Sequence, residues 1–379
     1  MTNIRFLRFS SIYKNYYPII YSKYILDHQH LDYAAHYKKF MNLKIAEFDS
    51  YKTNLESLGG FNCMEVIGNN EKLQKKWAEE NNINYPAYNW KKEIAIAQIK
   101  YFRPHILMVG GFIFTPEERA QLKKKYDIKL LLAWDGTLYT DPKKFLDIDL
   151  LLTCIVDIKR KYQRIGKNTV VLPFSFEKNV LKSIDVNKKR EVSFCGSLFY
   201  KYHKKRAQNL QYLIQNGVPI NLFIGNIKTG NYPFSKSILR ELVKARFDFA
   251  KILYQFQKIN QGVIFGRYMF QLLAQSKITL NFHGDNVLQA GNMRLIEATG
   301  SGACLVTDWK SNIVNYFESD KEIVTFKSKE EALEKIQYLL ENEKEREKIA
   351  YLGQQKTFTH YSGKKRMEIL KSILLKKLS

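Results

Sequence analysis

Short apolar runs alternate along the chain with longer stretches in which apolar residues recur every three or four positions. Runs of this length are typical of buried strands, and the periodic stretches are typical of amphipathic helices. The first half therefore predicts a succession of strands and helices. The predicted strands are 3–9, 61–67, 105–110, 128–134, 149–155 and 168–172, and the predicted helices are 30–58, 70–81, 88–101, 116–125 and 156–164.

The alternation of strands and helices is interrupted by the turn Leu172-Pro173-Phe174 and the polar stretch 177–190, which we interpret as a linker. It then starts again, and 379 residues exceed the usual length of one domain. We predict an α/β fold of two Rossmann-like domains facing a cleft, 1–175 and 176–360, followed by an amphipathic helix within 361–379. The second half predicts strands at 191–195, 219–224, 277–282, 303–307 and 322–326, and helices or amphipathic stretches at 203–216, 235–259, 266–275, 329–341, 343–358 and 363–378.

The stretch 288–308, LQAGNMRLIEATGSGACLVTD, predicts a short helix, a glycine-rich turn and a buried strand. Arg294 and Glu297 are three residues apart, so on a helix they lie on the same side. A helix start and a guanidinium can hold phosphate, and a carboxylate can accept hydrogen bonds from a sugar diol. The alternative is a surface helix with an ordinary ion pair. We predict that Asn292, Arg294, Glu297 and Gly302 bind a phosphorylated ligand that carries hydroxyl groups.

Ligands of open α/β sheets bind outside the carboxyl ends of the strands. Gly196 and Ser197 follow the predicted strand 191–195, and Arg206 lies near the start of the next helix. Backbone amides at a glycine turn, together with a nearby cation, favour contact with phosphate. A plain loop would also explain these residues, but we predict that all three contact the phosphates of the ligand.

Two further strand ends carry residues that can transfer protons. His283 can reach a ligand as a donor to phosphate or as an acid or base, unless its turn merely reverses the chain. Asp135 is the best-placed candidate for the base that deprotonates an acceptor hydroxyl, the alternative being a simple turn aspartate. Asp49 is a weaker rival because acids on helices are usually solvated. The Gly110-Gly111 turn could allow a ligand to approach closely, but backbone geometry alone also explains it.

The stretch 288–308 resembles the nucleotide-binding half of GT-B glycosyltransferases, especially the "glycosyl transferases group 1" proteins related to spore-maturation glycosyltransferases. Their pattern, N-x-R-x-x-E-A-x-G-x-G, an apolar strand and T-D, stands here as Asn292 to Gly302 and Thr307-Asp308. The resemblance covers about residues 190–370 well and the first half weakly. Larger retaining enzymes have a second glutamate where this chain has Gln289, which leaves the stereochemical outcome open.

The resemblance implies a GT-B fold in which the C-terminal helix crosses back to the first domain. It also implies a nucleotide-sugar donor on the C-terminal domain, with Glu297 on the ribose and Arg294, Ser197 and Arg206 near the diphosphate. The expected function is a hexosyltransferase-like glycosyltransferase that moves a sugar to a hydroxyl of a glycan, glycolipid or protein acceptor. Synthesis of bacterial surface glycan, lipopolysaccharide or glycoprotein is the expected setting.

Asp135 and His283 are the expected catalytic residues. GT-B enzymes generally work without a bound metal, so we expect no metal and no other cofactor. Two alternatives stay open: a non-catalytic sugar-nucleotide-binding or scaffold protein, and a sugar-nucleotide epimerase on the same fold.

Two clusters resemble metal sites. Asp147-Ile148-Asp149 matches the D-x-D motif of the GT-A architecture, but it precedes an apolar run and predicts the start of a strand. His28, His30, Asp32 and His36 lack a second ligand group. We therefore predict no metal at either place.

The chain carries 61 Lys and Arg against 37 Asp and Glu, a net charge of +24. Such a charge suits an anionic membrane surface, an anionic substrate or nucleic acid, although a general lysine bias would also explain it. Nucleic acid ranks last because no nucleic-acid motif is present. Without a signal peptide or a membrane-spanning run, we expect a cytoplasmic protein that can bind the inner leaflet peripherally. The cysteines, which we expect to be reduced and buried, are Cys63, Cys154, Cys195 and Cys304.

Overall fold

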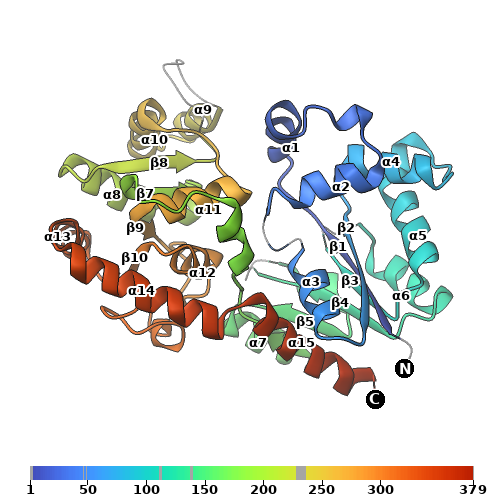
Figure 1. Ribbon diagram of the computed structural model, residues 1–379. Helices are drawn as coiled ribbons and strands as arrows, with labels where there is room; N and C mark the ends of the chain where they lie inside the picture. The colour runs from blue at the N-terminus through green and yellow to red at the C-terminus, as the bar shows by residue number, and fades with distance from the viewer. Residues whose placement is uncertain are drawn as a thin grey trace. The chain divides into compact units, whose positions relative to one another are not determined.

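The computed structural model describes residues 3–45, 47, 49–110, 113–136, 140–227 and 236–378. The chain divides into two compact units, which we call unit 1 (Met1–Pro173 with Gly363–Ser379) and unit 2 (Phe174–Ser362). Each unit contains one parallel sheet with helices on its faces (Figure 1). The predicted α/β class with two Rossmann-like domains is therefore confirmed. The predicted cleft between them stays a prediction.

Unit 1 has a six-stranded sheet of order β2-β1-β3-β4-β5-β6, in which all neighbouring strands are parallel. The direction in which strands are added reverses between β1 and β3, which makes this the topological switch point of the sheet. The strands are β1 (Ile4–Ser10), β2 (Phe61–Ile67), β3 (Ile106–Val109), β4 (Leu130–Trp134), β5 (Leu150–Thr153) and β6 (Thr169–Val171).

Helices cover both faces of this sheet because successive strand residues point to opposite sides. Phe6 and Met108 pack on one face with α3 and α15, whereas Leu7 and Leu107 pack on the other with α5, α6 and α7. The helices of unit 1 are α1 (Tyr16–Ile19), which continues into a π-helical turn (Ile20–Tyr24), α2 (Tyr33–Met41), α3 (Ser50–Ser57), α4 (Glu71–Glu80), α5 (Trp90–Phe102), α6 (Pro116–Lys125), α7 (Val156–Gln163) and α15 (Gly363–Leu378).

The predicted single helix 30–58 is wrong, because the chain forms α2 and α3 with a break between them. Leu43 and Ile45 are both buried, and Lys44 between them has a left-handed φ of 52°. A helix cannot continue through that conformation. Asp49, the weaker candidate base, precedes α3 and forms an ion pair with Lys44.

Unit 2 has a five-stranded parallel sheet of order β11-β10-β9-β7-β8, whose switch point lies between β7 and β9. Its strands are β7 (Arg190–Gly196), β8 (Ile220–Ile224), β9 (Ser276–Asn281), β10 (Cys304–Asp308) and β11 (Val324–Phe326). Its helices are α8 (Tyr200–Gln215), α9 (Lys236–Val243), α10 (Phe247–Ile259), α11 (Gly266–Gln275), α12 (Met293–Gly300), α13 (Lys329–Glu341) and α14 (Glu343–His360).

The helices of unit 2 also form two layers. One face of the sheet packs against α8, α10 and α13, and the other packs against α11 and α12. The predicted linker 177–190 is not wholly irregular, because Lys178–Ser183 forms a 3₁₀ helix. The other 3₁₀ helices are His28–His30, Ala87–Asn89, Pro142–Phe145 and Ile313–Asn315.

The C-terminal helix α15 belongs to unit 1, which confirms the predicted return of the chain to the first domain. Met367, Leu370 and Leu374 are completely buried there, in the layer that also contains α3. Arg366 is buried as well, and its Nη1 lies 2.5 Å from Oε2 of Glu47. The helix therefore supplies part of the core of unit 1.

The four cysteines are buried and free, as expected. Among the described residues, no helix combines the length and the apolar character that crossing a bilayer requires.

Candidate functional site

Arg206 projects from α8 and bridges the two loops at the switch point of unit 2. Its Nη1 donates to the carbonyl of Ser197, 2.9 Å away, after β7, and its Nη2 donates to the carbonyl of Phe282, 2.5 Å away, after β9. Burial of the guanidinium lowers the pKa of Arg206 to about 10, so it is still a cation at neutral pH. A Cβ on Gly196 would lie 3.0 Å from the Phe194 ring, so a larger residue here would have to push that ring aside.

The structure thus brings Gly196, Ser197 and Arg206 together, and it shows the backbone partners of the arginine. Both Nη atoms of Arg206 bind backbone carbonyls, and its Nε is buried without a partner in the described part of the chain. The predicted phosphate contact of Arg206 stays a prediction, to which these two carbonyl contacts add a structural role. Arg206 fixes the two loops that flank the switch point and adds positive charge beneath them.

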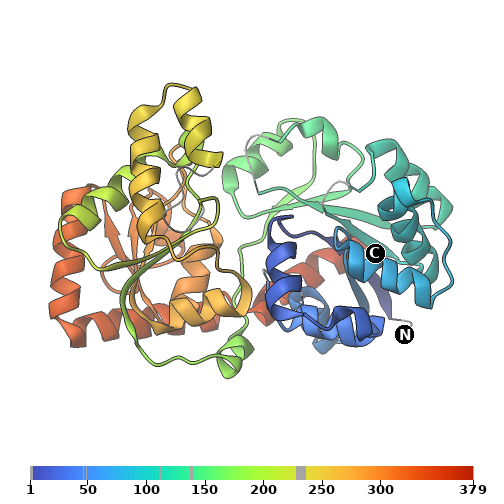
Figure 2. The ribbon, with the colours of Figure 1, turned by 90° about the horizontal axis from the view of Figure 1, so that it is seen from above.

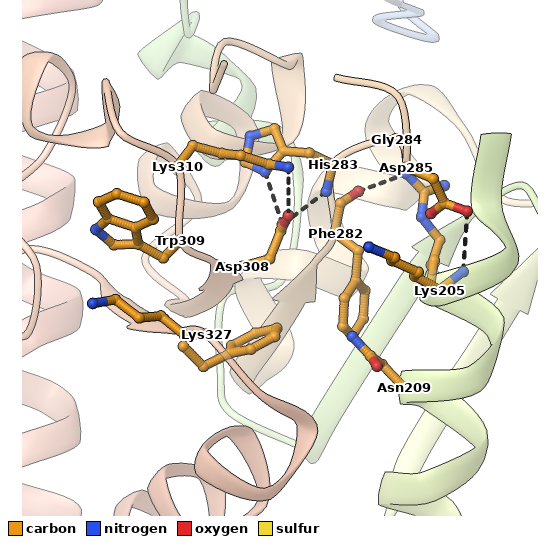
Figure 3. A pocket seen from close by; sticks show the side chains of 12 residues that line it. Lys205, Asn209, Phe282, His283, Gly284, Asp285, Asp308, Trp309, Lys310 and Lys327 are labelled. Carbon is orange, nitrogen blue, oxygen red and sulfur yellow. Dashed lines mark hydrogen bonds and ion pairs between the residues drawn. The ribbon is translucent and has the colours of Figure 1, made fainter. Parts of the chain in front are cut away.

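His283 and Asp308 form a hydrogen-bonded pair at the carboxyl ends of the neighbouring strands β9 and β10. The Nδ1 and the backbone N–H of His283 each lie 2.8 Å from Oδ1 of Asp308 (Figure 3). Burial alone would raise the pKa of Asp308, but its hydrogen bonds with His283, with help from Lys310, lower it below the ordinary value. The carboxylate therefore stays charged and holds the imidazole in one orientation.

The second ring nitrogen of His283 is the group left for chemistry. His283 is 5% exposed, and its Nε2 is buried without a hydrogen-bond partner in the described ranges. A buried polar atom of this kind is expected to find a partner, which here can be a ligand. The sequence singled out His283, but it assigned no role to Asp308, although Asp308 is part of the quoted motif.

A cavity of about 260 Å³ lies beside this pair, within unit 2. Figure 3 shows Lys205, Lys310 and Lys327 around it, with Trp309 at one side. Arg206 also lines the cavity, and the carboxylates that line it belong to Asp285 and Asp308. The cationic side chains around the cavity therefore outnumber the anionic ones. Such a cavity suits an anionic ligand that carries a flat or apolar part. The sequence did not predict roles for Trp309, Lys310 and Lys327, which come from strand ends that meet only in the sheet.

Helix α12 begins at the same edge of the sheet. Arg294 and Glu297 lie on the same side of it, as predicted, with Nη1 and Oε2 2.8 Å apart. Their side chains are only 16% and 9% exposed, so this is not the solvated surface pair of the alternative interpretation. Asn292 precedes the helix and donates from Nδ2 to Oδ1 of Asn281, 2.7 Å away, at the end of β9. The three motif residues therefore lie next to the switch point.

Gly302 does not belong to this group. It lies two residues before β10 begins, and therefore at the opposite, amino edge of the sheet. Its φ is 80°, and its carbonyl accepts a hydrogen bond from Nζ of Lys188 at 2.7 Å. Gly302 therefore lies apart from the other motif residues, where its positive φ suits the turn between α12 and β10, and its predicted contact with the ligand stays a prediction.

Asp135 in unit 1 is buried and hydrogen-bonded through both carboxylate oxygens. The residue is 3% exposed, and its two carboxylate oxygens accept hydrogen bonds from the hydroxyls of Tyr162 at 2.8 Å and Thr140 at 2.9 Å. Burial, followed by the hydrogen bond to Asp135, raises the pKa of Tyr162. These hydrogen bonds tie Asp135 to the structure around the end of β4, and its catalytic role stays a prediction. Gly111, the second residue of the predicted Gly110-Gly111 turn, lies outside the described residues.

The two clusters that resemble metal sites have other partners. Asp147 binds the guanidinium of Arg119 at 2.6 and 2.7 Å, and Asp149 binds Nζ of Lys123 at 2.6 and 2.7 Å. Asp32 caps α2. Within the ranges that the structure describes, no three His, Cys, Asp or Glu side chains gather to hold a metal ion.

Comparison with known proteins agrees with the resemblance noted in the sequence. Residues 236–372 match the family model described as glycosyl transferase-like. No curated protein sequence matches the chain. The recognition of a glycosyltransferase-like domain in this part of the chain is therefore confirmed.

Solved glycosyltransferase structures share the fold of the chain. A glycosyltransferase from Rickettsia africae ESF-5 is 10% identical, with both chains covered over 100% and a TM-score of 0.59. HepE (Alr3699) of Anabaena, in complex with UDP and glucose, is 10% identical, with 99% of this chain and 100% of that chain covered and a TM-score of 0.61. The lipopolysaccharide outer core galactosyltransferase WaaB is 14% identical, with 99% and 100% covered and a TM-score of 0.54. These identities are low, so the likeness shows the GT-B fold alone.

Proposed function

We propose that the protein is a glycosyltransferase that moves a sugar from a nucleotide-activated donor to a hydroxyl group of an acceptor. The observation that carries this proposal is the Arg294–Glu297 pair beside the switch point, within the stretch that matches a glycosyl transferase-like family. HepE, which shares the fold, was solved with UDP and glucose, and this supports a nucleotide-sugar donor for the present chain.

The donor binds unit 2 at the carboxyl edge of its sheet. The Glu297 carboxylate accepts hydrogen bonds from the ribose hydroxyls, while Arg294 and the start of α12 face the phosphates. The ion pair between the two side chains, at 2.8 Å, holds the carboxylate in place before the donor arrives. Gln289 lies in the loop before α12, and its Oε1 is buried without a partner in the described part of the chain, so it is available to a donor hydroxyl.

Breaking the bond between sugar and nucleotide leaves negative charge on the departing diphosphate. With Asp308 accepting from Nδ1–H and keeping the ring in position, His283 stabilises that charge by donating from Nε2 in its doubly protonated, imidazolium form. Lys205, Lys310 and Lys327 add positive charge around the adjacent cavity. We propose that these groups make a metal ion unnecessary, and that Asp147 and Asp149 have no part in the reaction because Arg119 and Lys123 bind them.

The remaining parts of the proposal concern the acceptor and the place of reaction. Unit 1 binds the acceptor, and a hexosyl group is the sugar transferred. Bacterial surface glycan, lipopolysaccharide or glycoprotein is the product to which the sugar is added. The protein acts in the cytoplasm at the inner leaflet, which the net charge of +24 supports.

Calorimetry with uridine and guanosine diphosphates and their sugars tests the donor site. Glu297→Gln is expected to weaken binding of the preferred nucleotide by about tenfold to a hundredfold, because charged hydrogen bonds to the ribose are lost. Glu334→Gln, at an exposed position of α13 in the same unit, is the matched control and should bind like the unchanged protein. Equal affinity of the two variants would refute the proposed donor site.

A non-catalytic sugar-nucleotide-binding protein is the second candidate. The engagement of Asp135 by Tyr162 and Thr140 favours it, since the predicted base is occupied. An enzyme slowly hydrolyses its donor even without acceptor and releases nucleoside diphosphate, whereas a binding protein does not. Measuring that release for each nucleotide sugar that binds separates the two candidates.

A further inference from the structure

Helix α9 carries an outward face that the core of unit 2 does not need. Ile238 is fully buried in the core with residues of α10, and Leu242, one turn later, also packs there. These two residues attach the helix. Figure 2 shows α9 and α10, in yellow and gold, projecting from the body of unit 2.

The outward face of α9 has an apolar side. Leu239 and Val243, one turn apart, are 47% and 87% exposed, and Phe247 at the start of α10 is 63% exposed. Three large apolar side chains so close along the chain are uncommon on a surface in contact only with water, because each costs hydrophobic free energy.

The same outward face has a basic side. Lys236, Arg240 and Lys244 follow one another at intervals of four residues and are all exposed. On a helix this spacing forms a row beside the row of Leu239 and Val243. The face therefore presents an apolar row and a cationic row next to each other.

Ion pairs of a buried glutamate connect α9 to its neighbours. Glu241 is 1% exposed, and its two oxygens bind Arg240 at 3.1 Å and Arg246 at 3.0 Å. The guanidinium of Arg246 also lies 4.0 Å from the centre of the Tyr200 ring in α8. Ala245, with a φ of 53°, forms the turn between the two helices. These contacts connect α9 to α10 and α8.

We propose that this face docks on an anionic lipid bilayer, with Leu239, Val243 and Phe247 entering the headgroup region and the row Lys236, Arg240 and Lys244 on the lipid phosphates. An apolar row beside a cationic row is the arrangement with which helices lie in a membrane interface. The chain's net charge of +24 supports the same partner. The inference deepens the proposed action at the inner leaflet, and it does not depend on the transfer reaction.

A fluorophore at Val243 tests whether this face enters the bilayer. All four native cysteines are buried, so Val243→Cys can be labelled selectively with an environment-sensitive dye. We expect a blue shift with vesicles of equal parts phosphatidylglycerol and phosphatidylcholine. The control is Val314→Cys, which is 71% exposed elsewhere in unit 2 and should give no shift. No shift at Val243, or an equal shift at both positions, would overturn the proposal.

Charge and apolar variants test the two rows separately in vesicle flotation. Lys236→Gln with Lys244→Gln should weaken binding by about fivefold for each lysine, since each contributes about 1 kcal/mol at an anionic surface. The charge-matched control is Lys344→Gln with Lys348→Gln, two exposed positions on α14. This control should lose less vesicle binding than the α9 lysine pair does. Leu239→Ser with Val243→Ser should weaken binding by about tenfold or more. Equal losses in both lysine pairs, or equal binding to pure phosphatidylcholine, would contradict the docking surface.

Two further results separate this inference from others. The α9 variants should bind the nucleotide-sugar donor as tightly as the unchanged protein does. Failure of the proposed donor site would therefore not affect the membrane proposal, and failure of the membrane proposal would not affect the donor site. Val243→Ser could instead alter the sedimentation coefficient of the free protein while the unchanged protein fails to float with vesicles. In that case the face joins two copies of the chain, and the membrane proposal is wrong.

Discussion

Nδ1 of His283 lies 2.8 Å from Oδ1 of Asp308, and the two residues come from the ends of neighbouring strands, β9 and β10. The same carboxylate oxygen also accepts the backbone N–H of His283. One aspartate thus fixes both the loop and the ring, and the ring presents Nε2 as its remaining nitrogen. This pair is the most specific chemical feature of unit 2.

Replacement of His283 tests that feature directly. His283→Gln is expected to lower the kcat/KM for transfer, or for donor hydrolysis, by about a hundredfold, the usual effect of losing a group that moves or donates a proton. The control is His360→Gln, at an exposed position at the end of α14. Steady-state kinetics measure the change, and a loss below about threefold would remove His283 from the mechanism.

Arg206 should contribute stability rather than a direct phosphate contact. Arg206→Met leaves the carbonyls of Ser197 and Phe282 without their donors, so we expect a loss of about 2–4 kcal/mol in the free energy of unfolding. Lys204→Met, two residues before it and exposed, should change stability little. Urea unfolding checks both variants. If Arg206→Met unfolds like the unchanged protein but no longer binds nucleotide, the earlier assignment to phosphate was correct.

Glu65 should make the stability of unit 1 depend on pH. Burial raises its pKa from 4.5 to about 7, although Arg8, 3.3 Å away, opposes the shift. Between pH 4.5 and about 7, Glu65 therefore keeps its proton in the folded protein but has lost it in the unfolded chain. The stabilisation is complete below pH 4.5 and is lost as the pH rises through about 7.

Glu65→Gln should consequently be more stable than the unchanged protein at pH 8, on the order of 2 kcal/mol, with a much smaller difference at pH 5. Denaturant unfolding at the two pH values measures this difference. Glu79→Gln, an exposed position in α4, should show no such pH dependence. A stabilisation of Glu65→Gln that is the same at both pH values would contradict the raised pKa.

The C-terminal helix should be required for unit 1 to fold stably. Leu370→Ala removes a completely buried side chain from the layer that α15 shares with α3, and we expect a loss of about 2–4 kcal/mol. Ile369→Ala, one residue before it and 44% exposed, should cost much less. Thermal unfolding of the two variants distinguishes a core helix from a loosely attached tail, for which both changes would be equally mild.

Most strands and helices could be predicted from the sequence because burial imposes a local period on apolar residues. The helix 30–58 was one exception, because the break at Lys44 depends on two buried neighbours and not on a glycine or proline. The Arg294–Glu297 pair was also predictable, since three residues on one helix set their separation.

The roles of Asp135, Gly302 and Asp308 could not be predicted in the same way. Each of them is hydrogen-bonded to a residue distant in the sequence. Asp135 binds Tyr162, which is 27 residues away, and Asp308 binds His283, which is 25 residues away. The carbonyl of Gly302 binds Lys188, at a separation of 114 residues. A strand end is recognisable in a sequence, but the side chain that meets it is not.

The sequence alone therefore determined that this protein has two parallel α/β domains and a helix with a paired cation and carboxylate, because both follow from spacing along one segment. The tertiary structure alone decided which polar groups are engaged and which face a cavity. Those outcomes depend on strand order and on side chains brought together from distant segments, and neither is encoded in any local pattern.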